Sequence, residues 1–426
     1  MWLINDGPAL FTDFYELTMA QVYFRRRMSG TAHFEVFVRR LPEHWGFFVM
    51  AGLSEVASYL REFRFTDADL AYLRSTGTFD DDFLAYLASF KPDVTLRALP
   101  EGTAFFPHEP ILEVGGPIID AQLLESYLLN ILGFSIIEAT LAARTTIAAR
   151  GIPVVDFGLR RCQGPVSSVR AARGAQIGGF KGTSNVFAAK RLDFPPSGTM
   201  AHSYVQACDS EEQAFRDFAQ IYGAKTILLV DTYDSIEGMK TAAHVAKEML
   251  TEKGIRISGI RLDSGDLAEL SKYARDYFEA EGLPFMKIFV SGDLDEYRIA
   301  DLLDRGAQID GIGIGTRYSA ARHAPAVEIV YKIIEYDGRR LHKRSPNKET
   351  HPGRKTVTRI EREKYQRDVV GPFDPNADDL LRPFRAAEPM ETIQKRLERE
   401  LARLPDETRA ICSPAEYPVE FGYFDG

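Results

Sequence analysis

Seven short apolar runs between Pro153 and Arg317 each end in a cluster of glycine, charged and hydroxyl residues. The runs are rich in β-branched residues and are separated by longer helical stretches, which is typical of β–α units around a parallel sheet buried on both faces. They occupy residues 154–161, 179–185, 197–203, 227–232, 259–266, 287–293 and 311–317. We therefore expect an α/β fold whose centre is an irregular, incomplete barrel of about seven parallel strands.

The spacers between the later runs predict amphipathic helices at 211–222, 236–253, 267–281 and 294–306. In a parallel barrel the carboxyl ends of all strands open on one face, where active sites lie. Any single polar cluster could be only a turn and a helix N-cap. That explanation is poor for the whole set of strand-end residues Arg160, Lys181, His202, Arg261, Asp263, Asp293 and Arg317. We expect these tips to converge on one pocket.

The chain on either side of the runs has a different character. Residues 1–135 mix both patterns and predict an α+β domain, followed by a barrel domain at 136–325 and a smaller region at 326–426 that packs on the first domain. The expected strands outside the barrel are 33–38, 93–99 and 327–336, and the expected helices are 53–62, 66–76, 80–90 and 389–404.

Composition excludes several classes of protein. With 426 residues, 45% of them hydrophobic, the chain can bury a large core. A net charge of -9 and a pI near 5.6 argue against nucleic acid or an anionic membrane as a partner, because both need a basic surface. The apolar window at 123–143 contains Glu125, Asn130 and Glu138, so we expect buried helices there and no membrane span.

The cysteines and the N-terminus indicate a reducing, cytoplasmic setting. Cys162, Cys208 and Cys412 are too far apart to predict a disulfide framework or a zinc site. The first residues lack the basic and apolar regions of a signal peptide. The basic stretch 339–344, with Lys348, Arg354 and Lys355, could bind polyphosphate, but a solvated β-hairpin and loop is the more common explanation.

The tips combine cations, carboxylates, glycine backbone and one histidine. The cations are Arg160, Arg161, Lys181, Arg261 and Arg317, and the carboxylates are Asp231, Asp263, Asp266 and Asp293. Cations and exposed N–H groups bind phosphate, and carboxylates beside a phosphate are typical of a Mg²⁺ site. Which carboxylates hold the metal stays open. The run 311–316 fits neither a dinucleotide fingerprint nor a Walker loop and is similar to the late-strand phosphate site of barrel enzymes.

The residue types alone leave the reaction open. His202 could be a structural histidine, or it could act on a phosphate as acid, base or phosphoryl acceptor. Lys181 would be the sole candidate for a Schiff base if the barrel were a phosphosugar aldolase.

Motifs in chain order resemble the signature set of the nicotinate phosphoribosyltransferase family. They are Asp156-Phe157-Gly158-x-Arg160-Arg161, Gly179-Phe180-x-Gly182-Thr183-Ser184-Asn185, Gly198-Thr199-x-Ala201-His202-Ser203, Asp231-Thr232-Tyr233-Asp234-Ser235, Arg261-Leu262-Asp263-Ser264-Gly265-Asp266-Leu267 and Gly313-x-Gly315-Thr316. Near the N-terminus, residues 12–19 resemble the opening motif of the family. The resemblance runs to about Tyr331.

The resemblance implies a reaction and its partners. The family joins nicotinate to 5-phosphoribosyl 1-diphosphate, forming nicotinate mononucleotide and diphosphate in NAD salvage. Mg²⁺ takes part, and ATP hydrolysis is coupled through a transient phosphohistidine, whose position is that of His202. A cytoplasmic homodimer with shared active sites is expected. The cysteine cluster that some members use for zinc is missing, so no zinc is expected.

The resemblance also assigns residues. Tyr15 of a second subunit and Phe157 would sandwich the pyridine ring, and Ser184, Thr199 and Arg261 would face it. The residues assigned to phosphoribosyl diphosphate are Arg160, Lys181, Asp263, Gly292, Asp293, Gly315 and Thr316. His202, Asp263 and Arg160 would carry the catalysis.

Three alternatives remain beside this assignment. Nicotinamide phosphoribosyltransferase has an acidic residue where this chain has Ser184, and since an anion would repel a carboxylate, the acid substrate is favoured here. Quinolinate phosphoribosyltransferase is shorter and lacks the Ala-His-Ser motif. A catalytically silent homologue that binds nucleotides or phosphoribosyl diphosphate is disfavoured by the retention of His202, Arg160, Arg261 and Asp263 together.

Overall fold

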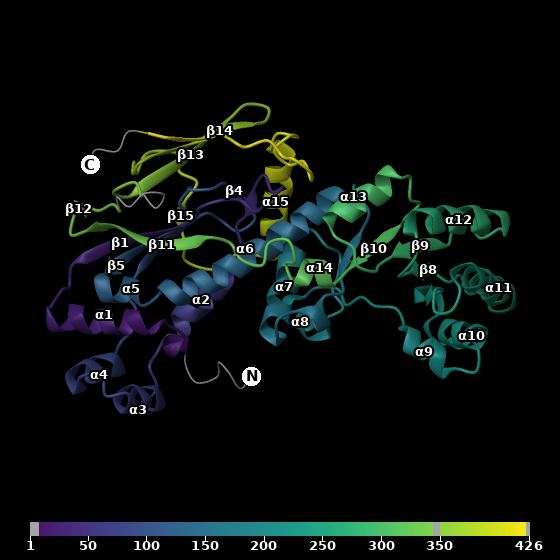
Figure 1. Cartoon of the computed structure of the whole chain (residues 1–426), viewed down its shortest axis with the longest axis horizontal. Helices are drawn as coiled ribbons and strands as arrows, with labels where there is room; N and C mark the ends of the chain where they lie inside the picture. Colours follow the sequence, from purple (N-terminus) through teal and green to yellow (C-terminus); the bar gives the residue numbers. More distant parts are fainter. Residues whose placement is uncertain (1–7, 344–349, 423–426) are drawn as a thin grey trace. The chain divides into compact units, whose positions relative to one another are not determined.

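The structure is a computed structural model of the 426-residue chain, in which residues 8–343 and 350–422 are described. The chain folds into two compact units, one made of residues 1–137 with 326–426 and the other of residues 138–325. Figure 1 labels the helices and strands of both units, which are described separately below.

The first unit is built on an antiparallel sheet that both ends of the chain share. The strand order is β12-β11-β1-β5-β3-β15. The strands are β1 (Thr31–Val38), β3 (Thr95–Ala98), β5 (Leu112–Pro117), β11 (Ile329–Tyr336), β12 (Arg339–Arg340) and β15 (Arg382–Pro383). Smaller sheets pair β2 (Phe48–Val49) with β4 (Ala104–Phe105), and β13 (Lys355–Glu361) with β14 (Tyr365–Pro372) and β16 (Val419–Phe421). Residues after 325 are thus part of the N-terminal sheet.

The helices of this unit are α1 (Phe14–Arg25), α2 (Leu53–Glu62), α3 (Asp67–Ser75), α4 (Asp81–Ala88), α5 (Ile118–Gln122) and α15 (Met390–Arg403), with a 3₁₀ turn at Pro8–Leu10. The helices α2, α3, α4 and α15 form at the four expected stretches, whereas α1 was not predicted from the sequence. The start of α3 is fixed by a capping box, in which Thr66 and Asp69 satisfy each other's backbone N–H groups.

One expectation for the basic stretch is wrong at its C-terminal end. The Lys355 side chain is 3% exposed, and its Nζ lies 2.7 Å from Glu35 Oε2. Arg354 pairs with Glu113 at 2.7 Å. Glu35 and Glu113 are cross-strand partners on β1 and β5, so the cations are drawn in by carboxylates from the other end of the chain. Arg339 and Arg340 are exposed as expected, and Lys348 lies outside the described residues.

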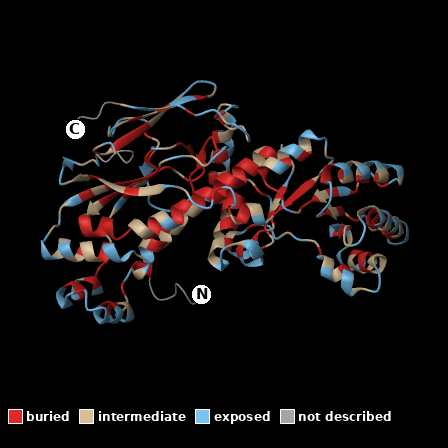
Figure 2. Cartoon of the chain, in the orientation of Figure 1, coloured by how far each residue is buried: buried red, intermediate tan, exposed pale blue. Residues whose placement is uncertain are grey.

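A long apolar helix, α6 (Glu125–Ala148), follows α5. Among the described residues, 118–148 is the one helical segment long and apolar enough to cross a membrane, with a mean hydropathy of 1.4 in its best window. Of that window, 78% is buried inside the protein, and Figure 2 shows this helix largely red. That burial is typical of a core helix.

The second unit contains a parallel sheet with strand order β6-β10-β9-β8-β7. The strands are β6 (Val154–Asp156), β7 (Ile227–Leu229), β8 (Gly259–Leu262), β9 (Lys287–Val290) and β10 (Gly311–Ile314). Single parallel bridges add Thr183 beside Asp156 and Pro196 beside Thr183. Six of the seven expected runs therefore pair in parallel, the second of them through Thr183 alone. The expectation for run 197–203 is wrong, because the bridge is formed by the preceding residue, Pro196, and α9 begins at His202. Pro195 and Pro196 lack the N–H that a longer ladder requires.

This sheet is open. In the described part of the chain no strand pairing connects the Pro196 segment to β7, so the α/β class with a parallel sheet is confirmed but a closed barrel is not present.

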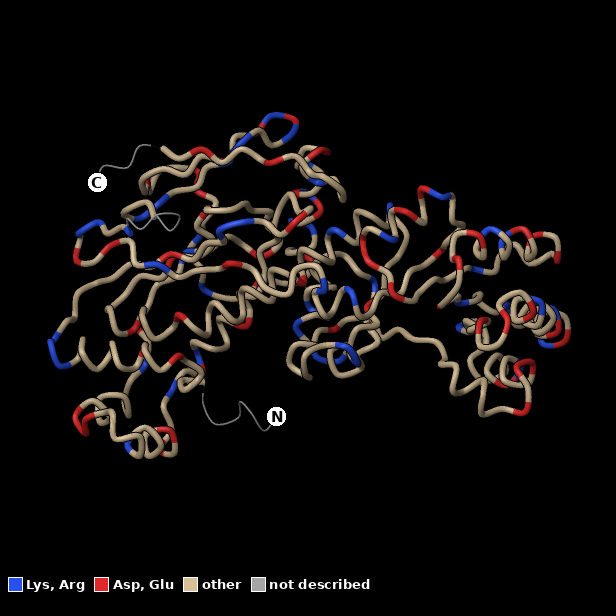
Figure 3. Tube along the Cα trace, viewed as in Figure 1, with Lys and Arg blue, Asp and Glu red and all other residues tan. Residues whose placement is uncertain are grey.

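Helices follow the strands of this unit. They are α7 (Pro165–Ile177), α8 (Val186–Leu192), α9 (His202–Ala207), α10 (Glu211–Tyr222), α11 (Ser235–Lys253), α12 (Leu267–Ala280), α13 (Glu296–Asp304) and α14 (Thr316–Ser319), with 3₁₀ turns at Leu159–Arg161 and Gly223–Lys225. Figure 3 shows basic and acidic residues interspersed along α10 to α13.

Some polar tip residues are helix caps. The side chains of Asn185, Asp234, Asp266 and Asp295 each accept a backbone N–H at the start of the next helix. The turn-and-cap explanation is right for these four.

Candidate active site

Arg261, at the end of β8, connects several strand tips. Its Nε donates to Ser291 Oγ at 2.7 Å, and its two terminal nitrogens donate to Thr199 Oγ1 at 3.2 Å and to Asp263 Oδ1 at 2.6 Å. Its guanidinium carbon lies 5.2 Å from the centre of the Phe157 ring. Since a guanidinium has five N–H donors, two remain for a ligand. The structure thus brings together the predicted residues Phe157, Thr199, Arg261 and Asp263.

Phe157 is held by its backbone and by a glycine opposite. Its N–H donates to the Ile314 carbonyl at 2.7 Å, which ties the end of β6 to the end of β10. A Cβ atom on Gly313 would overlap the Phe157 ring, so glycine at this position is what lets the ring lie against the β10 backbone. The half-buried ring keeps part of its surface open to solvent.

Asp263 is ionised, and its Oδ1 accepts hydrogen bonds from Arg261 and Ser291. Burial alone would raise its pKa, but the Ser291 hydroxyl at 2.5 Å and the charge of Arg261 hold the pKa below its usual value, and His202 adds to this. The Asp263 N–H donates to Asp231 Oδ2 at 2.8 Å. The second oxygen of Asp231 is buried and has no hydrogen bond within the described residues.

His202 begins α9 and reaches across the open side of the sheet. Its Nδ1 lies 3.2 Å from Thr232 Oγ1, although Thr232 follows β7 and His202 follows the Pro196 segment at the opposite end of the strand order. When Nδ1 carries the proton and donates it to Thr232, the lone pair is on Nε2. In the described part of the chain Nε2 has no hydrogen-bond partner.

Asp293 and Arg317 form an ion pair at the ends of β9 and β10. Arg317 donates to both oxygens of Asp293 at 2.7 Å and to Asp295 at 3.0 Å. These bonds hold the pKa of Asp293 below its usual range. Gly292 has φ +96°, and a Cβ there would overlap the Asp263 carbonyl. The Asp293 carboxylate would itself repel a phosphate. In an anion site its role would therefore be to orient the Arg317 guanidinium.

The other predicted residues are less engaged. The side chains of Arg160, Lys181 and Thr316 are exposed and make no hydrogen bond within the described ranges, and Ser184 and Gly315 are half-exposed. Tyr15 lies on α1 in the other unit with 47% of its surface exposed, where burial and the nearby Glu125 raise its pKa.

Several contact residues were not singled out from the sequence. Ser291 and Thr232 lie inside predicted runs, and their position after a buried strand was the available signal. Asp156 and Thr183 were quoted only as motif letters, although both prove to be buried and hydrogen-bonded to each other at 2.6 Å.

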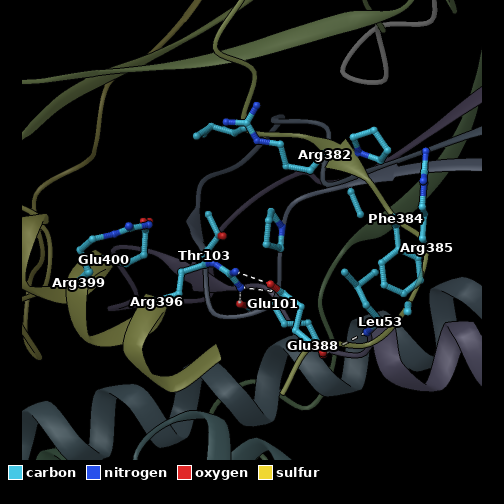
Figure 4. A pocket seen from close by; sticks show the side chains of 15 residues that line it. Leu53, Glu101, Thr103, Arg382, Phe384, Arg385, Glu388, Arg396, Arg399 and Glu400 are labelled. Carbon is cyan, nitrogen blue, oxygen red and sulfur yellow. Dashed lines mark hydrogen bonds and ion pairs between the residues drawn. The ribbon is translucent and has the colours of Figure 1, made fainter. Parts of the chain in front are cut away.

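Two features lie away from the strand tips. Glu212, His244 and Glu248 on α10 and α11 have metal-ligand spacing, but Arg216 donates to both carboxylates and takes the place a cation would fill. A cavity of about 510 Å³ in the first unit, shown in Figure 4, contains an Arg396–Glu388 ion pair and no predicted site residue.

Comparison with known proteins gives matches over most of the chain. The family model described as the nicotinate phosphoribosyltransferase N-terminal domain matches residues 10–133, and that of the nicotinate phosphoribosyltransferase family matches residues 152–369. A nicotinate phosphoribosyltransferase of Mycobacterium tuberculosis is 46% identical over 88% of this chain and 81% of its own. The enzyme of the same name from Bacillus subtilis is 38% identical over 98% of this chain and 93% of its own.

Solved structures agree with these matches. The chain is similar to human nicotinic acid phosphoribosyltransferase, with a TM-score of 0.82 and 28% identity, covering 96% of this chain and 97% of that one. It is also similar to a nicotinate-nucleotide pyrophosphorylase from Pyrococcus furiosus, with a TM-score of 0.76 and 26% identity over 95% of this chain and 98% of that one.

Proposed function

The chain belongs to the nicotinate phosphoribosyltransferase family, and from this premise we propose how its strand tips carry out the family reaction. The reaction is phosphoribosylation of nicotinate in NAD salvage, with 5-phosphoribosyl 1-diphosphate as the donor. The observation that carries the assignment of the site is Arg261, which contacts Phe157, Thr199, Asp263 and Ser291 and has two N–H donors to spare.

Nicotinate is a flat ring that carries a carboxylate, and each part has a partner at these tips. The pyridine ring stacks on Phe157, and the carboxylate accepts from the free N–H groups of Arg261 in a charge-assisted pair. Ser184 faces the same substrate as a neutral hydroxyl, which favours nicotinate over nicotinamide.

The phosphoribosyl donor binds beside it. Arg160 and Lys181, which have no acidic partner within the described residues, contact its phosphates, and the backbone at Gly292, Asp293, Gly315 and Thr316 holds the 5′-phosphate with Arg317. As the bond from C1 of the ribose to diphosphate breaks and the bond to the ring nitrogen forms, C1 becomes positive. The Asp263 carboxylate offsets that charge, and the cations stabilise the departing diphosphate.

The tips fit a Mg²⁺ ion. Asp231 has a buried oxygen with no hydrogen-bond partner among the described residues, and its other oxygen accepts from the Asp263 N–H, so Asp231 and Asp263 are the residues that would hold the metal. When bound, Mg²⁺ supplies positive charge to the diphosphate.

ATP coupling rests on His202. Its Nε2 attacks the γ-phosphorus of ATP, the bond to the β-phosphate oxygen breaks, and ADP leaves; hydrolysis of the phosphohistidine later releases phosphate. The hydrogen bond between Nδ1 and Thr232 supports this role, because it fixes the ring and leaves Nε2 free.

The proposal also covers the shape of the sheet and the assembly of the protein. We take the open sheet to be an incomplete barrel, because His202 and Thr232 approach across its gap. The site is completed in a cytoplasmic homodimer by Tyr15 of the partner subunit. In support, α1 and its lead-in expose an apolar surface formed by Phe11, Phe14, Tyr15 and Val22, each at least 45% exposed.

The test is an assay of purified protein with nicotinate or nicotinamide as the acceptor, with phosphoribosyl diphosphate, Mg²⁺, and ATP present or absent. We expect nicotinate mononucleotide, formed faster with ATP. Preference for nicotinamide would overturn the substrate assignment, and equal rates with and without ATP would overturn the coupling.

A further inference from the structure

Asp156, the last residue of β6, has both carboxylate oxygens bound inside the protein. The side chain is 1% exposed. Its Oδ2 accepts from the Thr183 hydroxyl at 2.6 Å, and its Oδ1 accepts from the Gly158 N–H at 2.7 Å. One carboxylate therefore joins two neighbouring strand tips, the one after β6 and the one at the Thr183 bridge.

The Gly158 bond fixes the turn that carries Phe157. The Gly158 carbonyl accepts from the Ser319 hydroxyl at 3.2 Å and from the Arg161 N–H at 2.8 Å. A Cβ at Gly158 would overlap Ser319, so only glycine lets this turn lie against Ser319. The turn is held on its N–H side by Asp156 and on its carbonyl side by Ser319.

The Thr183 bond fixes the loop that carries Ser184. Thr183 is fully buried, and its Oγ1 also accepts the Asn185 N–H at 3.0 Å. The Ser184 N–H donates to the Asp156 carbonyl at 2.7 Å. Asn185 continues the chain of bonds, because its side chain caps α8 at Ala188 and donates to Ser168. Asp156 therefore fixes the position of Ser184 in two ways: its carbonyl accepts from the Ser184 N–H, and its side chain accepts from the hydroxyl of the preceding residue, Thr183.

The bond to Gly158 alone would be an ordinary aspartate turn. The bond to Thr183 is different, because it joins residues 27 apart in the chain and no local turn requires it. Burial raises the pKa of Asp156, and the bonds from the Thr183 hydroxyl and the Gly158 N–H oppose that rise because both stabilise the carboxylate. Burial also raises the pKa of Glu138 well above its usual range and that of Cys162 to about 11, so both are neutral beside it.

We propose that Asp156, through Thr183, is a positioning residue that sets the spacing between the Phe157 ring and the Ser184 loop and so fixes the width of the nicotinate slot. This inference rests on the proposed function, in which both tips face nicotinate. Neither Asp156 nor Thr183 touches substrate. Arg160 and Lys181 of the same two tips are assigned to the phosphoribosyl donor, but its 5′-phosphate is held at the ends of β9 and β10, so we expect the larger effect on nicotinate binding.

The test compares Thr183→Val, Thr183→Ser and Asp156→Asn in the full-length enzyme. Valine keeps the shape of threonine but can neither donate to Asp156 nor accept from Asn185. Serine keeps both bonds, and asparagine keeps the acceptor for Gly158 while presenting an amide to Thr183. The matched control is Thr226→Val, since Thr226 is also fully buried, precedes β7 at the edge away from the tips, and its hydroxyl has no hydrogen-bond partner within the described residues.

Steady-state rates are measured with each substrate varied at saturating concentration of the other. We expect Thr183→Val and Asp156→Asn to raise KM for nicotinate about tenfold, the loss of one hydrogen bond to a charged group. KM for phosphoribosyl diphosphate should stay within about twofold, as should both values for Thr183→Ser and Thr226→Val. A purely structural role predicts no such split.

Three results would overturn the inference: an unchanged KM for nicotinate in Thr183→Val, an equal rise in both KM values, or failure of serine to restore the value. If Thr183→Val does not fold, Asp156→Asn decides; if neither folds, the pair is structural and the inference is wrong. Wild-type activity separates this test from the proposed function. Should the wild-type enzyme accept only nicotinamide, the proposed substrate is wrong, and the same comparison is made with nicotinamide.

Discussion

Replacing Arg261 by lysine tests the site most directly, because it keeps the positive charge and removes the geometry. Arg261 bonds to three side chains and has two N–H groups free for the nicotinate carboxylate. A lysine ammonium has three donors on one atom and cannot span Thr199, Asp263 and Ser291 while also bridging a carboxylate. The substitution therefore separates charge from shape.

The size of the effect follows from the bonds lost. A hydrogen bond to a charged group contributes about 1.5–3 kcal/mol, and lysine should keep at most one contact to the carboxylate. The loss of one substrate bond, with part of the positioning of Asp263, amounts to about 3 kcal/mol, or ~10²-fold in kcat/KM for nicotinate. Arg150→Lys is the control, because Arg150 pairs with Asp304 on the surface and both are more than half exposed.

The assay is initial-rate formation of nicotinate mononucleotide, with thermal unfolding measured on the same samples. Arg150→Lys should change kcat/KM by less than about twofold. If Arg261→Lys lowers kcat/KM for nicotinate by less than about fivefold, then the charge of Arg261 is enough to bind the acid substrate, and the argument from its planar fork is refuted.

Three further predictions concern other parts of the molecule. His202→Ala should abolish stimulation by ATP and leave slow ATP-independent transfer, and wild-type protein should carry acid-labile phosphate from γ-labelled ATP during turnover; absence of that label would contradict the phosphohistidine role. Burial raises the pKa of Glu16 from 4.5 to about 7, so the folded state holds a proton that the unfolded state has lost, and the free energy of unfolding should fall as pH rises from about 5 to 8. Denaturant titrations at both pH values should show a smaller fall for Glu16→Gln, and an equal fall would contradict the assignment. Lys355→Met should lower the free energy of unfolding by about 3–5 kcal/mol, because it leaves Glu35 charged and buried, and the double variant with Glu35→Met should recover most of it; a single-variant loss under about 1 kcal/mol would show that Glu35 takes up a proton instead.

The sequence predicted those helices and strands whose pattern is set by residues close together in the chain. Residues 53–62 and 211–222 form α2 and α10 with the expected ends, because an apolar face of period 3.6 specifies both, and Ser210 caps the start of α10. Short β-branched runs bounded by glycine and polar residues predicted the strands of the parallel sheet in the same local way. The open edge of the sheet was not predicted, since it depends on which strands pair in space.

Contacts between distant segments were beyond reach. The burial of Lys355 depends on Glu35, which lies 320 residues earlier and meets it through the fold of the first unit. In the sequence, Thr183 is one of several hydroxyl residues after a short apolar run, with nothing to distinguish it. Its role is evident only from the structure, where its hydroxyl donates to Asp156. Sequence showed which residue types gather at the strand ends, while the structure shows which of them hold one another.

Two side-chain hydrogen bonds cross the open side of the sheet, one between His202 and Thr232 and one from Arg261 to Thr199. A barrel closed by a ladder can be entered only along its axis, because several backbone bonds would have to break together at its side. Here the described residues hold the ends of the sheet together with single side-chain bonds, the neutral one at a cost of about 0.5–1.5 kcal/mol to open. The open side of the sheet beside His202 can therefore separate without breaking a backbone ladder, and under the proposed function ATP would reach Nε2 there without passing the nicotinate slot.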